Sequence, residues 1–446
     1  MGMLERFLNA PYRRIKLAFI GRDNLTASDI SDSNPLPMTI TGQDNLDAFG
    51  RLRVSSPTII FDSVLRSSKQ SIAWGEANTG NATSTHLPNE SSCRMRLTTT
   101  SGDKVVRQTH KYWRYQPGKS QLILMSNVCG TAKTNVRKRW GYFDIENGIF
   151  FEQIATGLAL VRRTNVTGSP TDTTVSQTNW NLDRLDGTGD SGIILDPSKC
   201  QIWCFDLEWL GVGRVRCGVN INGRTIYCHE FLHANLIQTV YMTTGHLPVR
   251  YECENIGDTA STTDFIQICT SVSSEGGRSL SPTLEFTVTS NTAAPITVTT
   301  RRPILTIRPK LQYRNQTNRR ILIPDVMAIY CTGADILYEV VRNASLSGNT
   351  SQWLPVSTES SMEYNIMADG LTEGMRLHSG FQVSGTGNRG GSILTPTSGQ
   401  DFSASQSTMA LSLNFDATSA DTLTVVATSL SGAASVLASM NVIELR

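Results

Sequence analysis

The chain has 446 residues, a formal net charge of +2 and 17% charged residues. This length favours two or three domains with sizeable cores. The near-neutral charge lacks the electrostatic footprint of a protein that binds nucleic acid or a membrane surface, so we expect neither partner.

The cysteines and the N-terminus indicate where the protein is made. There are nine cysteines, an odd number, which argues against a framework of disulfides. The longest apolar run near the N-terminus, residues 17–20, is too short for a signal sequence or a membrane span. We therefore expect a soluble protein made in a reducing cytosol, and we expect no cofactor.

Residues 1–46 read as an N-terminal arm. They are polar from Gly21 onward, with Ser, Asp and Asn clusters and two prolines, and they offer no core of their own. An arm of this kind is either laid against a partner or disordered.

Residues 47–300 carry the strand signals of a first folded domain. Short runs with period-two alternation recur between turn residues, at residues 58–61, 92–98, 104–115, 121–128, 140–145 and 149–154. No segment shows a long 3.6-residue period. The sequence therefore predicts an all-β protein whose main domain is an antiparallel sandwich or jelly roll.

From about Arg301 the pattern of the sequence changes, but strand signals continue to residue 446. They include residues 321–330, 336–341 and 423–428. We interpret them as a second, smaller C-terminal β-domain. The strand signals place the boundary within a window of about 30 residues near residue 300.

The stretch 201–231 predicts three consecutive strands at the centre of the first sheet. Asn222-Gly223 is the strongest short hairpin signal, since both residues tolerate positive φ. A two-residue turn there pairs Val219 with Ile226, Cys217 with Cys228 and Arg216 with His229. Arg216 and His229 are then expected side by side on the outward face.

His229-Glu-Phe-Leu-His233 matches the H-E-x-x-H pattern of zinc peptidases. That pattern needs a helix, because residues four apart in a strand are separated by about 13 Å and cannot share one zinc ion. Glu252, Glu254 and His246 could supply a third ligand, so the peptidase stays as an alternative. The predicted hairpin favours a strand, and we expect no metal and no enzyme activity.

Two other motifs resemble ligand loops. The acidic, Gly-rich stretch 181–190 has Leu185 where a calcium ligand is needed, so a turn is favoured over a cation site. The Gly-rich stretch 385–391 is not followed by a strand-to-helix step, so a surface loop is favoured over a phosphate cradle.

Basic and aromatic residues interleave between Arg107 and Tyr115. In one continuous strand, a single face would carry Arg107, Lys111, Trp113 and Tyr115. Aromatic and arginine side chains are enriched in interface cores, so we interpret this face, with Arg216 and His229, as a candidate subunit interface. An internal role or ligand binding are the alternatives.

Several motifs together resemble a widespread group of tailed-bacteriophage virion structural proteins. They are Asp47-Ala-Phe-Gly-Arg-Leu-Arg-Val, Thr85-His-Leu-Pro-Asn-Glu-Ser, Tyr115-Gln-Pro-Gly-Lys-Ser, Glu208-Trp-Leu-Gly-Val-Gly-Arg-Val-Arg, His229-Glu-Phe-Leu-His-Ala-Asn and Leu247-Pro-Val-Arg-Tyr-Glu. The resemblance covers about residues 47–277. It implies a concanavalin-like or jelly-roll sandwich in the virion, and it supplies no catalytic residues.

The functional expectation follows from that resemblance and from the arm. We expect a tail-associated structural protein of the baseplate, collar or fibre attachment, assembled in the host cytoplasm with copies of itself and other virion proteins. A capsid decoration or head-fibre protein is one alternative. A carbohydrate-binding module that meets a host-surface glycan is another, because lectin-like sandwiches expose aromatic residues, and a zinc peptidase is the third.

Overall fold

The computed structural model describes residues 18–20, 27–29, 46–53, 57–276, 283–291, 293–385 and 410–445. The chain divides into two compact units, Met1–Asn45 and Leu46–Arg446. In the first unit, β1 (Ala18–Ile20) pairs antiparallel with β2 (Ala27–Asp29). The remaining residues of the predicted arm up to residue 45 lie outside the described residues.

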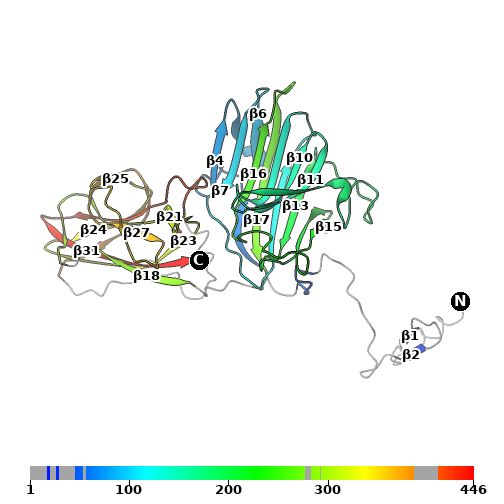
Figure 1. The fold of residues 1–446 in the computed structure, drawn as a ribbon. Helices are drawn as coiled ribbons and strands as arrows, with labels where there is room; N and C mark the ends of the chain where they lie inside the picture. The colour runs from blue at the N-terminus through cyan, green and yellow to red at the C-terminus, as the bar shows by residue number, and fades with distance from the viewer. Residues whose placement is uncertain are drawn as a thin grey trace, which may run out of the picture. The chain divides into compact units, whose positions relative to one another are not determined.

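The strands between residues 57 and 276 form two antiparallel sheets, which we call the first sandwich (Figure 1). The seven-stranded sheet has the order β12 (Thr171–Ser176), β11 (Gly157–Thr164), β10 (Gly148–Ile154), β9 (Val136–Phe143), β16 (Val249–Asn255), β7 (Lys104–Thr109) and β4 (Trp74–Thr79). The eight-stranded sheet has the order β15 (Arg224–Phe231), β14 (Val215–Ile221), β13 (Cys200–Leu207), β8 (Gln121–Val128), β17 (Thr263–Ser274), β6 (Ser92–Leu97) and β5 (Thr83–Leu87), with β3 (Thr58–Val64) also paired to β17.

The core of the first sandwich lies between these two sheets. Period-two alternation sends every second side chain inward, and large aromatic residues from both sheets meet there. The indole of Trp140 on β9 lies 4.8 Å from that of Trp203 on β13, and Phe151 on β10 lies 4.6 Å from Trp203. These contacts hold the sheets face to face, and the predicted antiparallel sandwich is confirmed.

The strands from residue 284 onward form a second sandwich with its own core. One sheet has the order β18 (Leu284–Thr289), β31 (Ala434–Leu445) and β19 (Ile296–Val298), with β23 (Ile321–Thr332) on the other side of β31. The other has the order β26 (Leu354–Pro355), β27 (Met362–Asn365), β20 (Arg302–Pro309), β30 (Leu423–Ser429), β24 (Ile336–Arg342) and β29 (Met375–Gln382). There are also two two-stranded sheets, the hairpin of β21 (Gln312–Tyr313) with β22 (Gln316–Thr317) and the pair of β25 (Ser345–Gly348) with β28 (Ala368–Thr372).

The change from the first sandwich to the second falls earlier than residue 300, near which the sequence placed the boundary within a window of about 30 residues. β18 and β19 pair with β31 near the C-terminus, so they belong to the second sandwich. The change of domain falls after Ser274, where β17 ends, and before Leu284, where β18 begins. The described residues contain no α-helix and only two 3-10 turns, η2 (Pro88–Glu90) and η3 (Gln177–Asn179). No helix among them is long and apolar enough to cross a membrane.

The hairpin of β14 and β15 matches its prediction near the turn and departs from it further along. Asn222 and Gly223 have φ of 54° and 76°, and Val219 pairs with Ile226. A β-bulge then shifts the register, so that Cys217 pairs with His229 and Arg216 pairs with Glu230. The predicted pairing of Arg216 with His229 is therefore wrong by one residue, and a one-residue shift turns a side chain to the opposite face.

Candidate functional site

The predicted face from Arg107 to Tyr115 does not exist as one strand. β7 ends at Thr109, whose hydroxyl donates to the carbonyl oxygen of Lys111 over 2.9 Å and closes a turn. Trp113 and Tyr115 are buried in the core of the first sandwich, and the Trp113 ring stacks on Phe61 at 4.5 Å. Burial inside the chain contradicts the predicted subunit interface for these residues and confirms the internal alternative.

Arg107 also points inward rather than toward a neighbour. Its guanidinium donates to Glu76 Oε2 and Gln267 Oε1, each over 2.6 Å, and its side chain is 1% exposed. Glu76 lies on β4 and Gln267 on β17, so one arginine joins the two sheets. Its role is to satisfy polar groups at the margin of the core.

The bulge decides the position of His229. The ring packs edge-on against Phe231 at 4.6 Å, and its Nδ1 accepts the backbone N–H of Asn181 over 3.3 Å. His229 therefore lies buried under the loop at Asn181, and its predicted place on the outward face is wrong. Burial lowers the pKa of His229 to about 4.

His233, the second histidine of the motif, follows the end of β15 and faces other partners. Its Nδ1 is 2.6 Å from the carbonyl oxygen of Gly213, and its ring stacks on Tyr241 at 3.9 Å. Burial lowers the pKa of His233 to about 4 as well. The strand predicted for His229 is confirmed, and each histidine is used to hold a different loop in place.

We expect the protein to purify without stoichiometric zinc. The two histidines lie on a strand and beyond its end, a geometry that does not bring two ring nitrogens to one ion. Elemental analysis after dialysis against zinc should give well under one ion per chain, and Glu230→Gln should leave zinc content unchanged. One tightly held zinc ion that is lost in His229→Gln would contradict this interpretation.

The two remaining loop motifs also have structural explanations where they are described. Asp183 is buried, and its carboxylate accepts the backbone N–H groups of Leu185 and Ser191, over 2.9 and 2.8 Å. That carboxylate therefore closes a turn, which is the interpretation that the sequence favoured over a cation site. Of the Gly-rich stretch 385–391, residues 386–391 lie outside the described residues.

A cluster of buried polar groups surrounds Asp206 on the outer face of the eight-stranded sheet. Asp206 is fully buried and accepts hydrogen bonds from Arg53, Arg216 and Ser120, each over 2.6 Å, and from the Tyr227 hydroxyl over 3.1 Å. We call these five residues the Asp206 cluster. Arg216 is 1% exposed, so its predicted role at a subunit interface is contradicted.

The Asp206 cluster fixes the start of the folded body. Arg216 Nη2 donates to the carbonyl oxygen of Leu46 over 2.6 Å, and Arg53 Nε donates to the same oxygen over 3.1 Å. Arg214 Nε binds the carbonyl oxygen of Ala48 over 3.0 Å. Residues 46–53 thus lie across the sheet and cover Arg216, which explains why an outward-facing arginine is buried.

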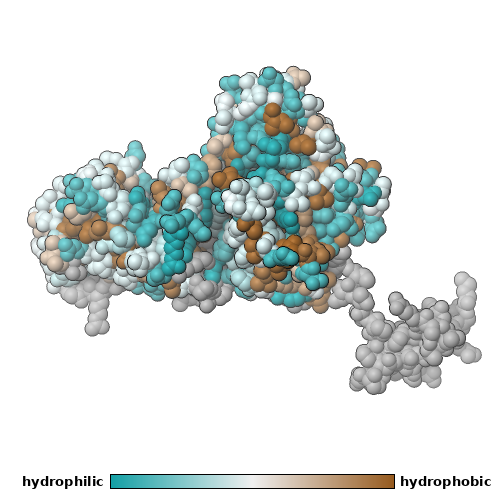
Figure 2. All heavy atoms as spheres, viewed as in Figure 1, coloured by the Kyte–Doolittle hydropathy of each residue, from teal (hydrophilic) through white to brown (hydrophobic). Residues whose placement is uncertain are grey.

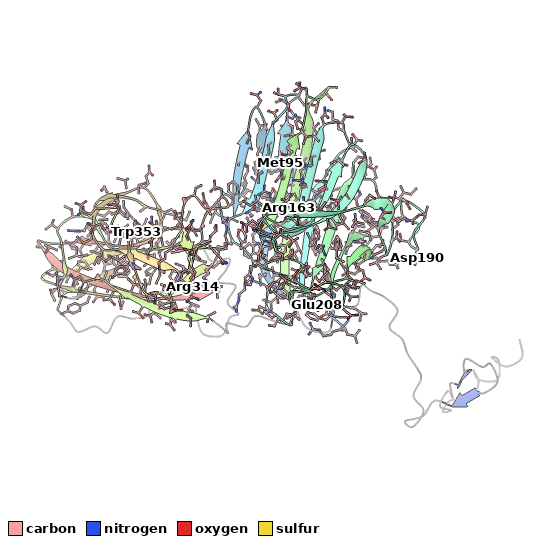
Figure 3. The ribbon with its side chains drawn as sticks, viewed as in Figure 1. Met95, Arg163, Asp190, Glu208, Arg314 and Trp353 are labelled. Carbon is pink, nitrogen blue, oxygen red and sulfur yellow. The ribbon has the colours of Figure 1, made fainter. Side chains whose placement is uncertain are left out.

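An apolar surface lies beside this attachment, on two loops at one end of the first sandwich. It consists of Leu210, Val212, Leu232, Leu236 and Val240, whose exposed fractions are 47%, 39%, 51%, 69% and 38%. We call it the apolar loop patch. In Figure 2, hydrophobic residues gather at the end of the sandwich where Figure 3 labels Glu208.

The five residues belong to one surface because their loops are bonded together. The Tyr241 N–H donates to Gly211 O over 2.9 Å, His233 bridges to Gly213, and a Cβ added at Gly211 would lie 2.8 Å from Val240 Cγ1. Leu210 adopts φ of +37°, a strained conformation for leucine. Contiguous exposed apolar residues on a held, strained loop mark an interaction surface, whereas scattered ones are ordinary.

Comparisons with known proteins give likenesses of fold alone. No family model matches the chain, and no curated protein matches it. Similar solved structures include a glycosyl hydrolase family protein from Mycobacterium fortuitum, at 12% identity and a TM-score of 0.34, covering 48% of this chain and 99% of that one. A legume lectin-like domain from Entamoeba histolytica has 8% identity and a TM-score of 0.30, covering 49% and 98%. A protein of unknown function from Shewanella oneidensis has 9% identity and a TM-score of 0.32, covering 55% and 98%.

The carboxylates on the outer face of the seven-stranded sheet form ion pairs. Glu252 pairs with Arg250 and Lys104, and Glu152 pairs with Arg139 over 2.7 Å. Although burial raises it, these cations lower the pKa of Glu252 to about 2. The paired carboxylates and cations form an ion-pair ladder on this face.

Sequence reasoning missed the apolar loop patch, although a signal was present. Leu210 and Val212 alternate with Gly211 and Gly213, a turn in which polar residues are the norm. Two apolar residues that alternate with turn glycines predict a loop that contacts something other than water.

Proposed function

We propose that this chain is a structural subunit of a tailed-bacteriophage particle, tail-associated, that assembles with copies of itself and with other virion proteins. The observation that carries the proposal is the apolar loop patch, an exposed surface that a monomer in water has no reason to keep. The sequence motifs that resemble virion structural proteins are the reason for proposing that this assembly is a phage particle.

The chemistry of the patch fits the core of a protein interface. Its centre is aliphatic, and charged residues flank it, including Glu230 and Arg214, which lie 3.4 Å apart. An apolar core inside a polar rim is the usual anatomy of a subunit contact. Fully burying one leucine contributes about 1.5–3 kcal/mol. Burying several such residues together supplies apolar area that favours a stable contact.

We expect purified particles to contain this protein in a fixed copy number. Replacing Leu232 and Leu236 together with glutamate should reduce incorporation by about tenfold or more, because each 1.4 kcal/mol changes a dissociation constant tenfold. Quantitative mass spectrometry of particles grown with each variant measures both quantities.

Ile256→Glu is the matched control. Ile256 is 57% exposed, and it precedes β17, whose other end pairs with the start of β8 beside the patch. It therefore lies at the opposite end of the first sandwich and should leave incorporation unchanged. Absence of the protein from particles, or equal incorporation of the patch variant and the control, would overturn the proposal. The head-fibre and carbohydrate-binding alternatives stay predictions, as does the expectation that the protein has no enzyme activity.

A further inference from the structure

We propose that the apolar loop patch binds the N-terminal segment, residues 1–45, of a neighbouring copy of this chain. This inference rests on the proposed function and names the partner of its surface. The chain divides after Asn45 into two units, so a segment of 45 residues precedes the folded body.

The place where that segment leaves the body is the first support. Leu46 is held by Arg216 and Arg53, and Ala48 is held by Arg214, the residue that follows the 208–213 loop of the patch. The segment therefore starts beside the patch of its own copy. A chain of 45 residues spans up to about 150 Å when extended, which is ample to reach the same patch on an adjacent copy.

The composition of the segment is the second support. Its first 22 residues contain aliphatic and aromatic residues that suit an apolar surface, namely Leu4, Phe7, Leu8, Leu17, Phe19 and Ile20. The same 22 residues carry Arg6, Arg13, Arg14, Lys16 and Arg22 against Glu5, five cations and one anion, a net charge of +4. Glu208, whose backbone oxygen accepts the Tyr241 hydroxyl over 3.0 Å, lies at the edge of the patch and offers a carboxylate to these cations, whereas Glu230 is already paired with Arg214.

The residues at the base of the segment are also bonded to the body, as a segment that links two copies requires. Arg53 joins Asp206 to Glu275 at the end of β17, over 2.6 and 2.5 Å, so the root of the segment is tied to two strands of the sheet. A segment that links two copies carries force through the residues that attach it to the body. If those residues were loosely bonded, they would open locally. A heterologous contact of this kind builds rings or repeating arrays.

The test is photo-crosslinking of the full-length protein with p-benzoylphenylalanine in place of Leu236. Unlabelled protein carrying the crosslinker is mixed with 15N-labelled protein that lacks it. We expect crosslinked peptides from residues 1–22 that bear the 15N label, which shows that they come from another copy. Crosslinks only to unlabelled residues 1–22 of the same chain, crosslinks to other surfaces, or no crosslinks would each overturn the proposal.

A matched pair of variants separates this inference from the proposed function. Phe7→Asp with Phe19→Asp should abolish the labelled crosslink and reduce incorporation into particles as much as the Leu232→Glu, Leu236→Glu variant does. Thr26→Asp, a polar position in the same segment, should change neither. If the Phe7, Phe19 variant is incorporated normally while the patch variant is not, the segment is not the partner but the proposed function stands. If neither variant affects incorporation, the proposed function fails as well.

Discussion

Replacing Asp206 with alanine is expected to lower the free energy of unfolding of the first sandwich by about 3–5 kcal/mol. Removing one partner of a buried ion pair leaves the other as an uncompensated buried charge. Arg216 is 1% exposed and would lose its carboxylate, as would the Ser120 and Tyr227 hydroxyls that donate to it. Arg53 keeps Glu275 and is affected less. Urea unfolding followed by tryptophan fluorescence measures the change.

The fluorescence reports mainly on the relevant sandwich, since six of the seven tryptophans precede residue 277 and only Trp353 follows. Asp172→Ala is the control, because Asp172 pairs with Arg163 over 2.8 Å at the surface and should change stability by less than about 1 kcal/mol. Asp206→Asn, which keeps the shape and one acceptor, should fall between the two. Equal stabilities for Asp206→Ala and the control would show that the Asp206 cluster contributes little.

Local chemistry made the strands and the central hairpin predictable. Asn222 and Gly223 adopt the positive φ values that their residue types favour, and Val219 pairs with Ile226 as the turn length requires. The bulge near Cys228 could not be predicted, because an extra residue in a strand leaves no local pattern when its neighbours are all compatible with a strand. One extra residue was enough to place His229 on the wrong face.

The errors that matter most come from contacts between distant residues. Arg216 was expected at the surface because its strand alternates correctly, yet residues 46–53 lie across it through the hydrogen bond to Leu46. β18 was assigned to the first domain, yet its partner β31 begins at Ala434. Neither pairing has a sequence signal within reach of a local window. The apolar loop patch was missed for a different reason, since Leu210 and Val212 do alternate with turn glycines and gave a local signal that was not used.

Stability of the first sandwich should fall as the pH drops from 6.5 toward 4.5. His229 and His233 each have a pKa lowered by burial to about 4, whereas the unfolded chain has the ordinary value of 6.5. Below pH 6.5 the unfolded chain binds more protons at these histidines than the folded protein does, so the free energy of unfolding declines as the pH falls. Between about pH 5.5 and 4.5, each histidine contributes a slope of about 1 kcal/mol per pH unit.

Two carboxylates oppose the histidines in this window, because burial raises the pKa of Glu208 and of Glu275. The histidine contribution is therefore obtained by comparing variants. Glu252, with a pKa lowered to about 2, contributes stability that is lost only as the pH falls below its ordinary value of 4.5. Burial lowers the pKa of His110 too, so it adds to the same slope. His229→Gln should remove about one histidine's contribution to the pH dependence of the free energy of unfolding. At pH 7.5 these histidines are neutral in both states, so any loss of stability that remains there reflects lost packing.

The same titration tests the link between His233 and the apolar loop patch. Protonation of His233 places a charge on a buried ring that holds Gly213 and stacks on Tyr241, so its cost is relieved only when the two patch loops separate. Hydrogen exchange of the 208–213 and 232–241 loops should therefore accelerate between pH 6 and 5 before global unfolding, and His233→Gln should remove that acceleration. Loops that stay protected until the whole sandwich unfolds would show that the histidine stabilises the fold without controlling the patch.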